Sequence, residues 1–465
     1  MKSRAARIAR FILRWTIATL GIIWVLTNLH LYDRALVLDD NQLPVERKLL
    51  EPANEQSDSF VIASDTGPLS VQRDRVINGP DRKTIILDPA SPAVKLLGMR
   101  LAGDLDKSPR VLELLITDSN GRGRWIRPDE VVDGFVLDVP QPRVQEGILT
   151  MLHRANPWLL VGSFSVIIVT FICTTIRWKS LLHALGVNLT LSQTFVLNMV
   201  GAFYNTFMPG STGGDVLKAY YAAKQAPEQR TAVVMSVIID RVLGLLTLIM
   251  LGGSMAAIQF ALSPDPTDPV ARMCRRVALF AALLLSITVV GLWAIYTPWL
   301  RRRLGISRLL SEGKVGDKLR KILDVMQIYR QRPGLIFRAI LITVPVHVSV
   351  IVSAMLAGEA FGLPISPGYY FIVVPVVVLS GAIPISPQGV GVMEAFAFYL
   401  TKQEGATLNQ ALALTMSIRL VSIFWNLLGG IFVLRGGFHA PKEVDVAGEN
   451  IDTDKVATES LRAQS

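Results

Sequence analysis

Six apolar runs, each long enough to cross a lipid bilayer, limit what this chain can fold into. A hydrocarbon core of about 30 Å needs roughly 20 apolar residues in helical conformation. The runs lie at 11–29, 157–177, 232–257, 277–298, 336–358 and 409–434. Of the 465 residues, 51% are hydrophobic and 18% are charged, which is typical of a chain that crosses a membrane several times.

Two further apolar stretches each end at a break rich in proline and glycine, and the two breaks repeat each other. At a constant offset of 178 residues (387 − 209) the aligned pairs are Pro209 with Pro387, Gly213 with Gly391, Tyr221 with Tyr399, Arg241 with Arg419, and Gly252 with Gly430. Non-helical backbone at membrane depth is tolerated where it is buried in protein or lines a cavity. We therefore expect two re-entrant hairpins, at 191–223 and 369–403.

The distribution of lysine and arginine between the loops predicts the orientation. Most of these residues fall on the cytoplasmic side, as the positive-inside rule expects, when the cytoplasmic segments are 1–14, 178–190, 224–231, 299–335 and 435–465. The loop at 359–368 has no lysine or arginine and is expected outside. Both termini are then cytoplasmic, and the first hairpin opens to the cytoplasm while the second opens outward.

The predicted fold class is an all-α polytopic membrane protein with six full spans and two re-entrant hairpins. The hairpins belong to an inverted-topology repeat, whose halves cover about 157–257 and 336–434. Paired segments of this kind, interrupted by glycine and proline, point to the binding site of a transporter.

Residues 30–145 differ from the rest because they are polar and contain no apolar run of spanning length. Short runs with β propensity alternate there with turn-forming clusters, and these runs are 59–63, 83–87, 111–117 and 135–139. We predict a small β-rich extracytoplasmic insert between an N-terminal span (1–29) and a transmembrane domain (146–435). An interfacial helix is expected over 147–155, and the polar tail, 436–465, is expected to be disordered.

Charged residues occur inside the apolar runs, where they are costly and usually face the interior of the helix bundle to serve a function. Asp240 and Arg241 lie in one run, and Arg419 lies in another. Arginine suits phosphate, because its planar fork can donate two parallel hydrogen bonds. The alternative is an internal ion pair that locks two helices, for example Asp240 with Arg419.

The broken hairpins supply the other candidate binding residues. Their glycines allow tight turns, and the free N–H groups at the start of a new helix suit an anion. The candidates are Asn205, Gly213, Gly214, Asp215 and Lys218 in the first hairpin and Gly389, Gly391 and Glu394 in the second. Asp215 could instead cap the new helix, and Glu394 could do no more than complement its dipole.

In this order the motifs resemble the flippase-like family also known as the lysylphosphatidylglycerol synthase transmembrane region. The matching pieces are the segment from Asn205 to Lys218, the pair Asp240-Arg241, the segment from Pro384 to Glu394, and Arg419. The resemblance covers about 157–435 and the first span. It implies a multi-pass protein of a bacterial-type inner membrane, whose relatives are thought to move or handle lipids, aminoacylated phospholipids among them. The family core lacks the 30–145 insert, and no aminoacyltransferase domain is recognisable here, so lysyl transfer is not expected.

We expect a lipid flippase or translocase that holds a phospholipid or glycolipid headgroup between the hairpins, near Lys218, Arg241 and Arg419. Its partners would be membrane lipids with an anionic or phosphate-bearing headgroup, and the insert could bind a further extracytoplasmic partner. The alternatives are a membrane-embedded transferase with Asp215, Asp240 or Glu394 as base, a non-transporting scaffold for a lipid-modifying enzyme, and a small-solute carrier. The sequence has no nucleotide fingerprint, metal-ligand cluster or nucleophile motif, so no cofactor, metal, nucleic-acid partner or catalytic residue is predicted.

Overall fold

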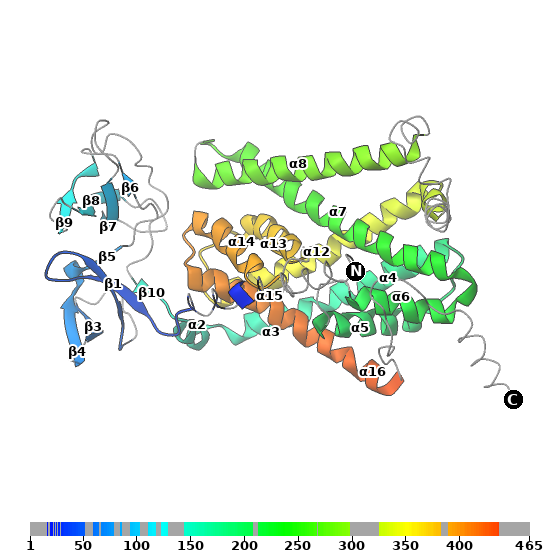
Figure 1. Cartoon of the computed structure of the whole chain (residues 1–465), viewed down its shortest axis with the longest axis horizontal. Helices are drawn as coiled ribbons and strands as arrows, with labels where there is room; N and C mark the ends of the chain where they lie inside the picture. The colour runs from blue at the N-terminus through cyan, green and yellow to red at the C-terminus, as the bar shows by residue number, and fades with distance from the viewer. Residues whose placement is uncertain are drawn as a thin grey trace, which may run out of the picture.

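The computed structural model describes residues 16–436, apart from one long segment and several shorter ones. The residues left out within this range are 17–18, 22, 24, 26, 28, 52–58, 65–66, 79–83, 86–93, 103–109, 118–121, 129–143, 208–212, 267, 298–324 and 383–388. The predictions for 1–15, for a strand at 135–139 and for the tail after residue 436 therefore lie outside the described residues. The described chain is mostly helical, with small β sheets towards its N-terminus (Figure 1).

Helices account for most of the described chain after residue 147. They are α2 (Ile148–Arg154), α3 (Pro157–Val166), α4 (Ile168–Ala184), α5 (Leu191–Phe207), α6 (Gly213–Gln225), α7 (Arg230–Leu262), α8 (Pro269–Tyr296), α12 (Pro333–Ala360), α13 (Pro367–Ala382), α14 (Val392–Thr401), α15 (Leu408–Leu428) and α16 (Gly430–Gly436). The helix α2 lies where the sequence predicts an interfacial helix.

Five helical stretches are long and apolar enough to cross a membrane. They are Pro157–Ala184, Pro227–Leu262, Pro269–Gly291, Pro333–Ala360 and Leu408–Arg435. These candidate spans coincide with five of the six predicted apolar runs, and the remaining run, 11–29, lies mostly outside the described residues. Their outer faces carry large exposed apolar side chains, such as Leu279, Phe280 and Val289 of α8. Such a surface is suited to lipid rather than to water.

The β part consists of short antiparallel strands. They are β1 (Arg34–Leu38), β2 (Pro44–Lys48), β3 (Ser59–Ser64), β4 (Gly67–Gln72), β5 (Val76–Ile77), β6 (Thr84–Ile85), β7 (Val94–Ala102), β8 (Arg110–Thr117), β9 (Gly123–Ile126) and β10 (Val144–Gln145). The strands β10, β1 and β2 form one sheet, with β5 also paired to β1; β3 pairs with β4, and β6 to β9 form a meander. The predicted runs at 59–63, 83–87 and 111–117 overlap β3, β6 and β8, whereas the other strands were not predicted.

A small apolar core explains why β1 forms the centre of its sheet. Along β1 the side chains of Ala35 and Val37 are buried, two residues apart, as expected for one face of a strand. They pack against Phe60, Ile62 and Val71 from the β3–β4 hairpin. The β part lies at one end of the molecule, and α2 lies between it and the longer helices (Figure 1).

The long helices form two units with the same order of neighbours. In the unit α4–α7, α4 packs against α5 and α7, and α6 packs against α5 and α7. In the unit α12–α15, α12 packs against α13 and α15, and α14 packs against α13 and α15. The contacts between the units also correspond, because α7 packs against α13 and α15 packs against α5. The aligned sequence segments thus occupy equivalent places in the two units.

The first helix of each unit ends in the same way. Gly186 after α4 has φ +82°, and Gly362 after α12 has φ +66°, a left-handed conformation that favours glycine. The N–H of Val187 donates to the carbonyl of Leu182, and the N–H of Leu363 donates to that of Gly358, both at 3.0 Å. These bonds from the residue after the glycine are those of a Schellman motif. The two caps account for the short sequence match around Gly186 and Gly362.

Asn409, in the first turn of α15, joins the helices to the base of the β part. Its side-chain oxygen accepts a hydrogen bond from the N–H of His30 (3.1 Å), and its amide nitrogen donates to the carbonyls of His30 (3.1 Å) and Glu146 (2.7 Å). The Asn409 residue is buried. The chain segments that enter and leave the β part are therefore held together at one end of α15.

We predict that Asn409→Ala lowers the thermal midpoint of unfolding of the protein in detergent. The substitution removes all three hydrogen bonds: the N–H of His30 and the carbonyl of Glu146 lose this partner, whereas the carbonyl of His30 keeps the N–H of Ile148. Each partly buried group that is left unpaired typically costs about 1–3 kcal/mol. Asn41→Ala is a matched control, since the Asn41 side chain is exposed in a turn of the β part. Equal midpoints for the two variants would contradict a structural role for Asn409.

Candidate functional site

The charged candidate residues of the helical part fall into two groups, one in each unit. The first group is formed by Arg177 of α4, Asp215 and Lys218 of α6, and Asp240 and Arg241 of α7. We call it the first-half cluster. The other group is Glu394 of α14 with Arg419 of α15, and we call it the second-half pair.

Asp240 is the centre of the first-half cluster. Its carboxylate lies 2.7 Å from Nε of Arg177 and 3.8 Å from Nζ of Lys218. Arg177 also donates from Nη1 to the hydroxyl of Thr343 in α12 at 2.9 Å. All three charged side chains are buried. This network links four helices, and it supplies the counter-charge that buried cations need.

Lys218 has a second contact, with the ring of Trp178. Its ammonium group lies 3.7 Å from the centre of the indole ring, a cation–π arrangement. The indole is held in place because its N–H donates to the hydroxyl of Ser236 at 3.1 Å. Gly201 of α5 allows this helix to approach, since a Cβ there would lie 3.1 Å from Cβ of Lys218. Lys218 is therefore enclosed by protein rather than open to a ligand.

Asp215 and Arg241 form the accessible part of the first-half cluster. The carboxylate of Asp215 lies 2.5 Å from Nη2 of Arg241. The Arg241 side chain is 41% exposed and the Asp215 side chain is 24% exposed, in contrast to the buried Asp240 network. A ligand that reaches this surface would meet the Arg241 guanidinium first.

Asn205 and the glycines shape the start of α6. The side-chain oxygen of Asn205 accepts a hydrogen bond from the N–H of Gly214 at 2.8 Å, so Asn205 satisfies one of the free donors of the helix start. The helix begins at Gly213, and at Gly214 a Cβ would lie 1.9 Å from the carbonyl oxygen of Gly201. Glycine is thus required at 214 for α5 and α6 to lie together, while the Asp215 carboxylate binds Arg241.

The second hairpin reaches its helix through two glycines with left-handed backbone. Gly389 has φ +69° and Gly391 has φ +83°. The N–H of Gly391 donates to Oε2 of Glu394 at 2.7 Å, and Oε1 of Glu394 lies 2.9 Å from Nη2 of Arg419. Glu394 is fully buried, and the Arg419 side chain is 11% exposed. Glu394 therefore does more than complement a helix dipole, because it also neutralises Arg419.

Each unit contains one acid–arginine pair in an equivalent place: Asp215–Arg241 is partly exposed, and Glu394–Arg419 is buried. Each pair joins the first turns of the short helix after the break to the middle of the following long helix. Asp215 and Arg241 are 26 positions apart (241 − 215), and Glu394 and Arg419 are 25 apart (419 − 394). The same pairing thus occurs twice, once partly exposed and once buried.

The suggested ion pair between Asp240 and Arg419 is wrong. The structure pairs Asp240 with Arg177 and Lys218, and it pairs Arg419 with Glu394. Each charge finds its partner inside its own unit, because α4, α6 and α7 pack together in one unit and α14 packs against α15 in the other. Arg177 was missed because it stands where the apolar run 157–177 ends, and the basic residues there were assigned to a loop. The helix α4 in fact continues to Ala184 and keeps Arg177 inside the bundle.

The site contains the groups for binding an anion, and no metal centre is apparent in it. The described part of the chain contains no group of three or more His, Cys, Asp or Glu side chains that could hold a metal ion. In the first-half cluster three basic side chains face two acidic ones, so one positive charge is in excess. The second-half pair is neutral. An anionic group would therefore be attracted to the first-half cluster.

The helices, their apolar outer faces and the paired buried charges define an integral, multi-pass membrane protein. Residues 145–430 match the family described as the lysylphosphatidylglycerol synthase TM region, and the chain belongs to this family. A UPF0104 membrane protein of Methanocaldococcus jannaschii is 23% identical over 313 residues, which are 64% of this chain and 91% of that protein. A UPF0104 membrane protein of Methanothermobacter thermautotrophicus is 23% identical over 295 residues, which are 59% of this chain and 84% of that protein.

We predict that Asp240→Asn destabilises the protein far more than Asp215→Asn. The first change leaves Arg177 and Lys218 buried without a counter-charge, and breaking a buried pair in this way typically costs roughly 3–5 kcal/mol. The second change breaks a partly exposed pair, for which about 0–1 kcal/mol is typical. Thermal unfolding of both variants in detergent, followed by tryptophan fluorescence, measures the difference. Similar midpoints for the two variants would show that the Asp240 network is not the structural one.

Proposed function

We propose that the protein is a lipid flippase or translocase that binds the phosphate-bearing headgroup of a membrane lipid beside Arg241. The observation that carries this proposal is the repeated acid–arginine pair, Asp215 with Arg241 and Glu394 with Arg419, at the two hairpin breaks. Membership of a family named after a lipid-modifying synthase is consistent with a lipid substrate. The site binds the headgroup, and the acyl chains remain in the bilayer.

Arg241 is the main headgroup ligand in this proposal. Its guanidinium remains charged and can bind two phosphate oxygens at once, whereas the partly exposed Asp215 can exchange its partner when the phosphate arrives. Lys218 and Arg177 attract the headgroup through their electrostatic potential and do not contact it, because both are enclosed and already paired with Asp240. The excess positive charge of the first-half cluster then favours anionic lipids over neutral ones.

The arrangement in the membrane follows the predicted topology. In this proposal the chain has six spans, α5–α6 and α13–α14 are re-entrant hairpins in an inverted repeat, and both termini lie in the cytoplasm of a cell with a bacterial-type inner membrane. The equivalent helix neighbours and the equivalent caps at Gly186 and Gly362 support the repeat. The first-half cluster then lies in the cytoplasmic leaflet and the second-half pair in the outer leaflet.

The difference in exposure between the two pairs supports alternating access. The Arg241 side chain is 41% exposed while the Arg419 side chain is 11% exposed, so one end of the proposed pathway is open and the other is closed. Movement of one half against the other would exchange these states, as in other transporters with inverted repeats. Arg419 then becomes the headgroup ligand on the outer side.

A lipid-scrambling assay in proteoliposomes tests the proposal. Fluorescent lipids with anionic and zwitterionic headgroups are compared for the unmodified protein and for Arg241→Gln. We expect movement that depends on the headgroup and falls about tenfold or more in the variant, because a hydrogen bond to a charged group typically contributes at least that factor. Arg275→Gln, at an exposed arginine of α8, is the matched control and should retain full activity.

Two results would contradict the proposal that the protein is a flippase. Absence of movement for every lipid, with and without an imposed proton gradient, would favour a membrane-embedded transferase or a non-transporting scaffold. Movement that is unaffected by Arg241→Gln, in a variant that unfolds at the same temperature as the unmodified protein, would place the headgroup site elsewhere. A lower unfolding midpoint for Arg241→Gln alone would indicate a structural role for the pair.

A further inference from the structure

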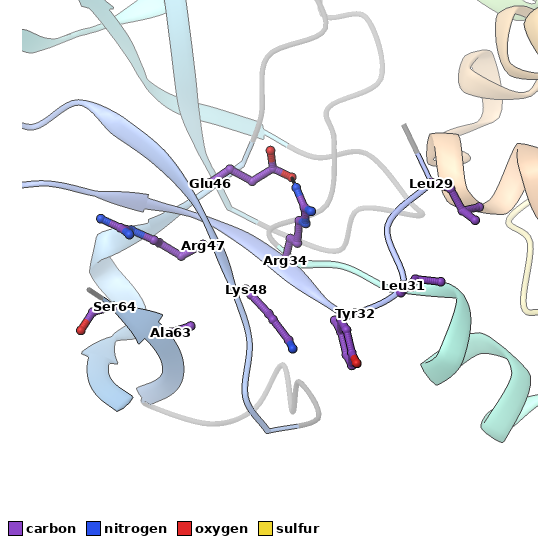
Figure 2. Close-up of a pocket in the computed structure, with 9 residues that line it drawn as sticks. All are labelled: Leu29, Leu31, Tyr32, Arg34, Glu46, Arg47, Lys48, Ala63 and Ser64. Atoms are coloured by element: carbon purple, nitrogen blue, oxygen red, sulfur yellow. Dashed lines mark hydrogen bonds and ion pairs between the residues drawn. The ribbon is translucent and has the colours of Figure 1, made fainter. Parts of the chain in front are cut away.

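A cavity of about 510 Å³ lies at the base of the β part, outside the helical units. It is lined by Leu29, Leu31, Tyr32, Arg34, Glu46, Arg47, Lys48, Ala63 and Ser64 (Figure 2). These residues come from the segment just before β1, from β1 and β2, and from the end of β3. The cavity is therefore formed where the chain passes from the membrane part into the sheets.

The pairing of β1 with β2 brings charged side chains together in this cavity. The strands are antiparallel, with Arg34 opposite Lys48 and Leu36 opposite Glu46. Because alternate residues of a strand share a face, Arg34, Glu46 and Lys48 lie on the same side of the sheet. Arg34 forms an ion pair with Glu46 at 3.3 Å. In Figure 2 the Arg47 side chain extends away from the cavity, Arg34 points towards Glu46, and Lys48 points towards Tyr32, so Arg34 and Lys48 are the cations of interest, one at each side of the cavity.

Lys48 is held in position by an aromatic ring. Its ammonium group lies 3.3 Å from the centre of the Tyr32 ring, and its three donors have no acidic partner among the ion pairs of the described residues. Oε1 of Glu46 also lies 3.7 Å from Nε2 of His30, so the carboxylate is shared between Arg34 and His30. Arg34, Lys48 and Glu46 thus leave one positive charge in excess, on a side chain that a ring keeps pointed into the cavity.

Apolar side chains lie beside these charges. Leu31 and Tyr32 are each 50% exposed, and Leu149 and Leu152 of the neighbouring helix α2 are also exposed. The backbone of α2 is bonded to the same segment, since the N–H of Leu149 donates to the carbonyl of Leu31. Exposed leucine and tyrosine next to basic groups are typical of a surface that meets the headgroup region of a bilayer.

We propose that this cavity binds a phosphate group, supplied by an anionic phospholipid of the membrane leaflet that faces the β part. Lys48 and Arg34 would bind the phosphate oxygens, while Leu31, Tyr32 and the exposed face of α2 contact the upper acyl chain. The site goes beyond the proposed translocation site, because it uses no residue of the helical units. It would give the β part a role in holding or releasing the lipid at one side of the membrane.

Photo-crosslinking of the full-length protein in lipid nanodiscs tests this proposal. The discs consist of phosphatidylcholine with a small fraction of phosphatidylglycerol that carries a photoactivatable headgroup. Labelled peptides are identified after digestion with chymotrypsin, whose cleavage sites do not depend on lysine or arginine. We expect labelling of residues 29–50 to fall about tenfold in Arg34→Gln/Lys48→Gln, since each cation binds the phosphate by hydrogen bonds to a charged group.

The control variant, Arg73→Gln/Arg124→Gln, removes two exposed charges from the same part of the chain, away from the cavity. Equal labelling of the cavity variant and this control would overturn the proposal. Competition distinguishes the source of the phosphate: displacement by a short-chain phosphatidylglycerol alone supports a lipid, and equal displacement by inorganic phosphate identifies a soluble phosphate compound. Labelling of 29–50 is read separately from labelling of 213–241, so failure of this site and failure of the translocation site are distinguishable.

Discussion

A charge inside a bilayer requires a partner, and this requirement determines how the helices of this protein are arranged. Asp240 is the partner of two cations at once, because its carboxylate lies between Arg177 of α4 and Lys218 of α6. Arg177 extends the network to Thr343 of α12. Three helices thus meet at one carboxylate, and α4, α6 and α7 cannot separate without leaving a buried charge unpaired, while α12 is joined to them through a hydroxyl. Such a network is expensive to form, so its value lies in fixing one arrangement.

The charged side chains of the first-half cluster differ in their access to a ligand. Arg177, Lys218 and Asp240 satisfy one another in the interior, whereas Asp215 and Arg241 remain partly exposed. The equivalent pair in the other unit, Glu394 with Arg419, is buried and carries an additional bond from the N–H of Gly391. The same chemistry is therefore present in both units, and the two copies differ in access alone.

The sequence predicted the elements whose signal is local. Apolar runs of spanning length predicted five described spans, and the proline–glycine breaks predicted where α6 and α14 begin. The ion-pair partners could not be predicted, because a carboxylate such as Asp240 meets residues that are 22 and 63 positions earlier (240 − 218 and 240 − 177). Arg177 was missed for a related reason: hydropathy detects where an apolar run ends, and a helix can continue beyond it when a charge finds a partner. Most strands were missed because they are short and their cores form only after pairing.

The hydrogen bonds of Asn409 limit how the two parts of the molecule can move relative to each other. Asn409 lies in the first turn of α15, and Arg419 lies further along the same helix, so both belong to one rigid element. Its amide binds the backbone at His30 and at Glu146, the two ends of the β part. Any displacement of α15 that exposed Arg419 would either carry the base of the sheets with it or break the three partly buried hydrogen bonds of Asn409. Breaking them is costly, so the arrangement of charges in the membrane part and the position of the β part are mechanically coupled.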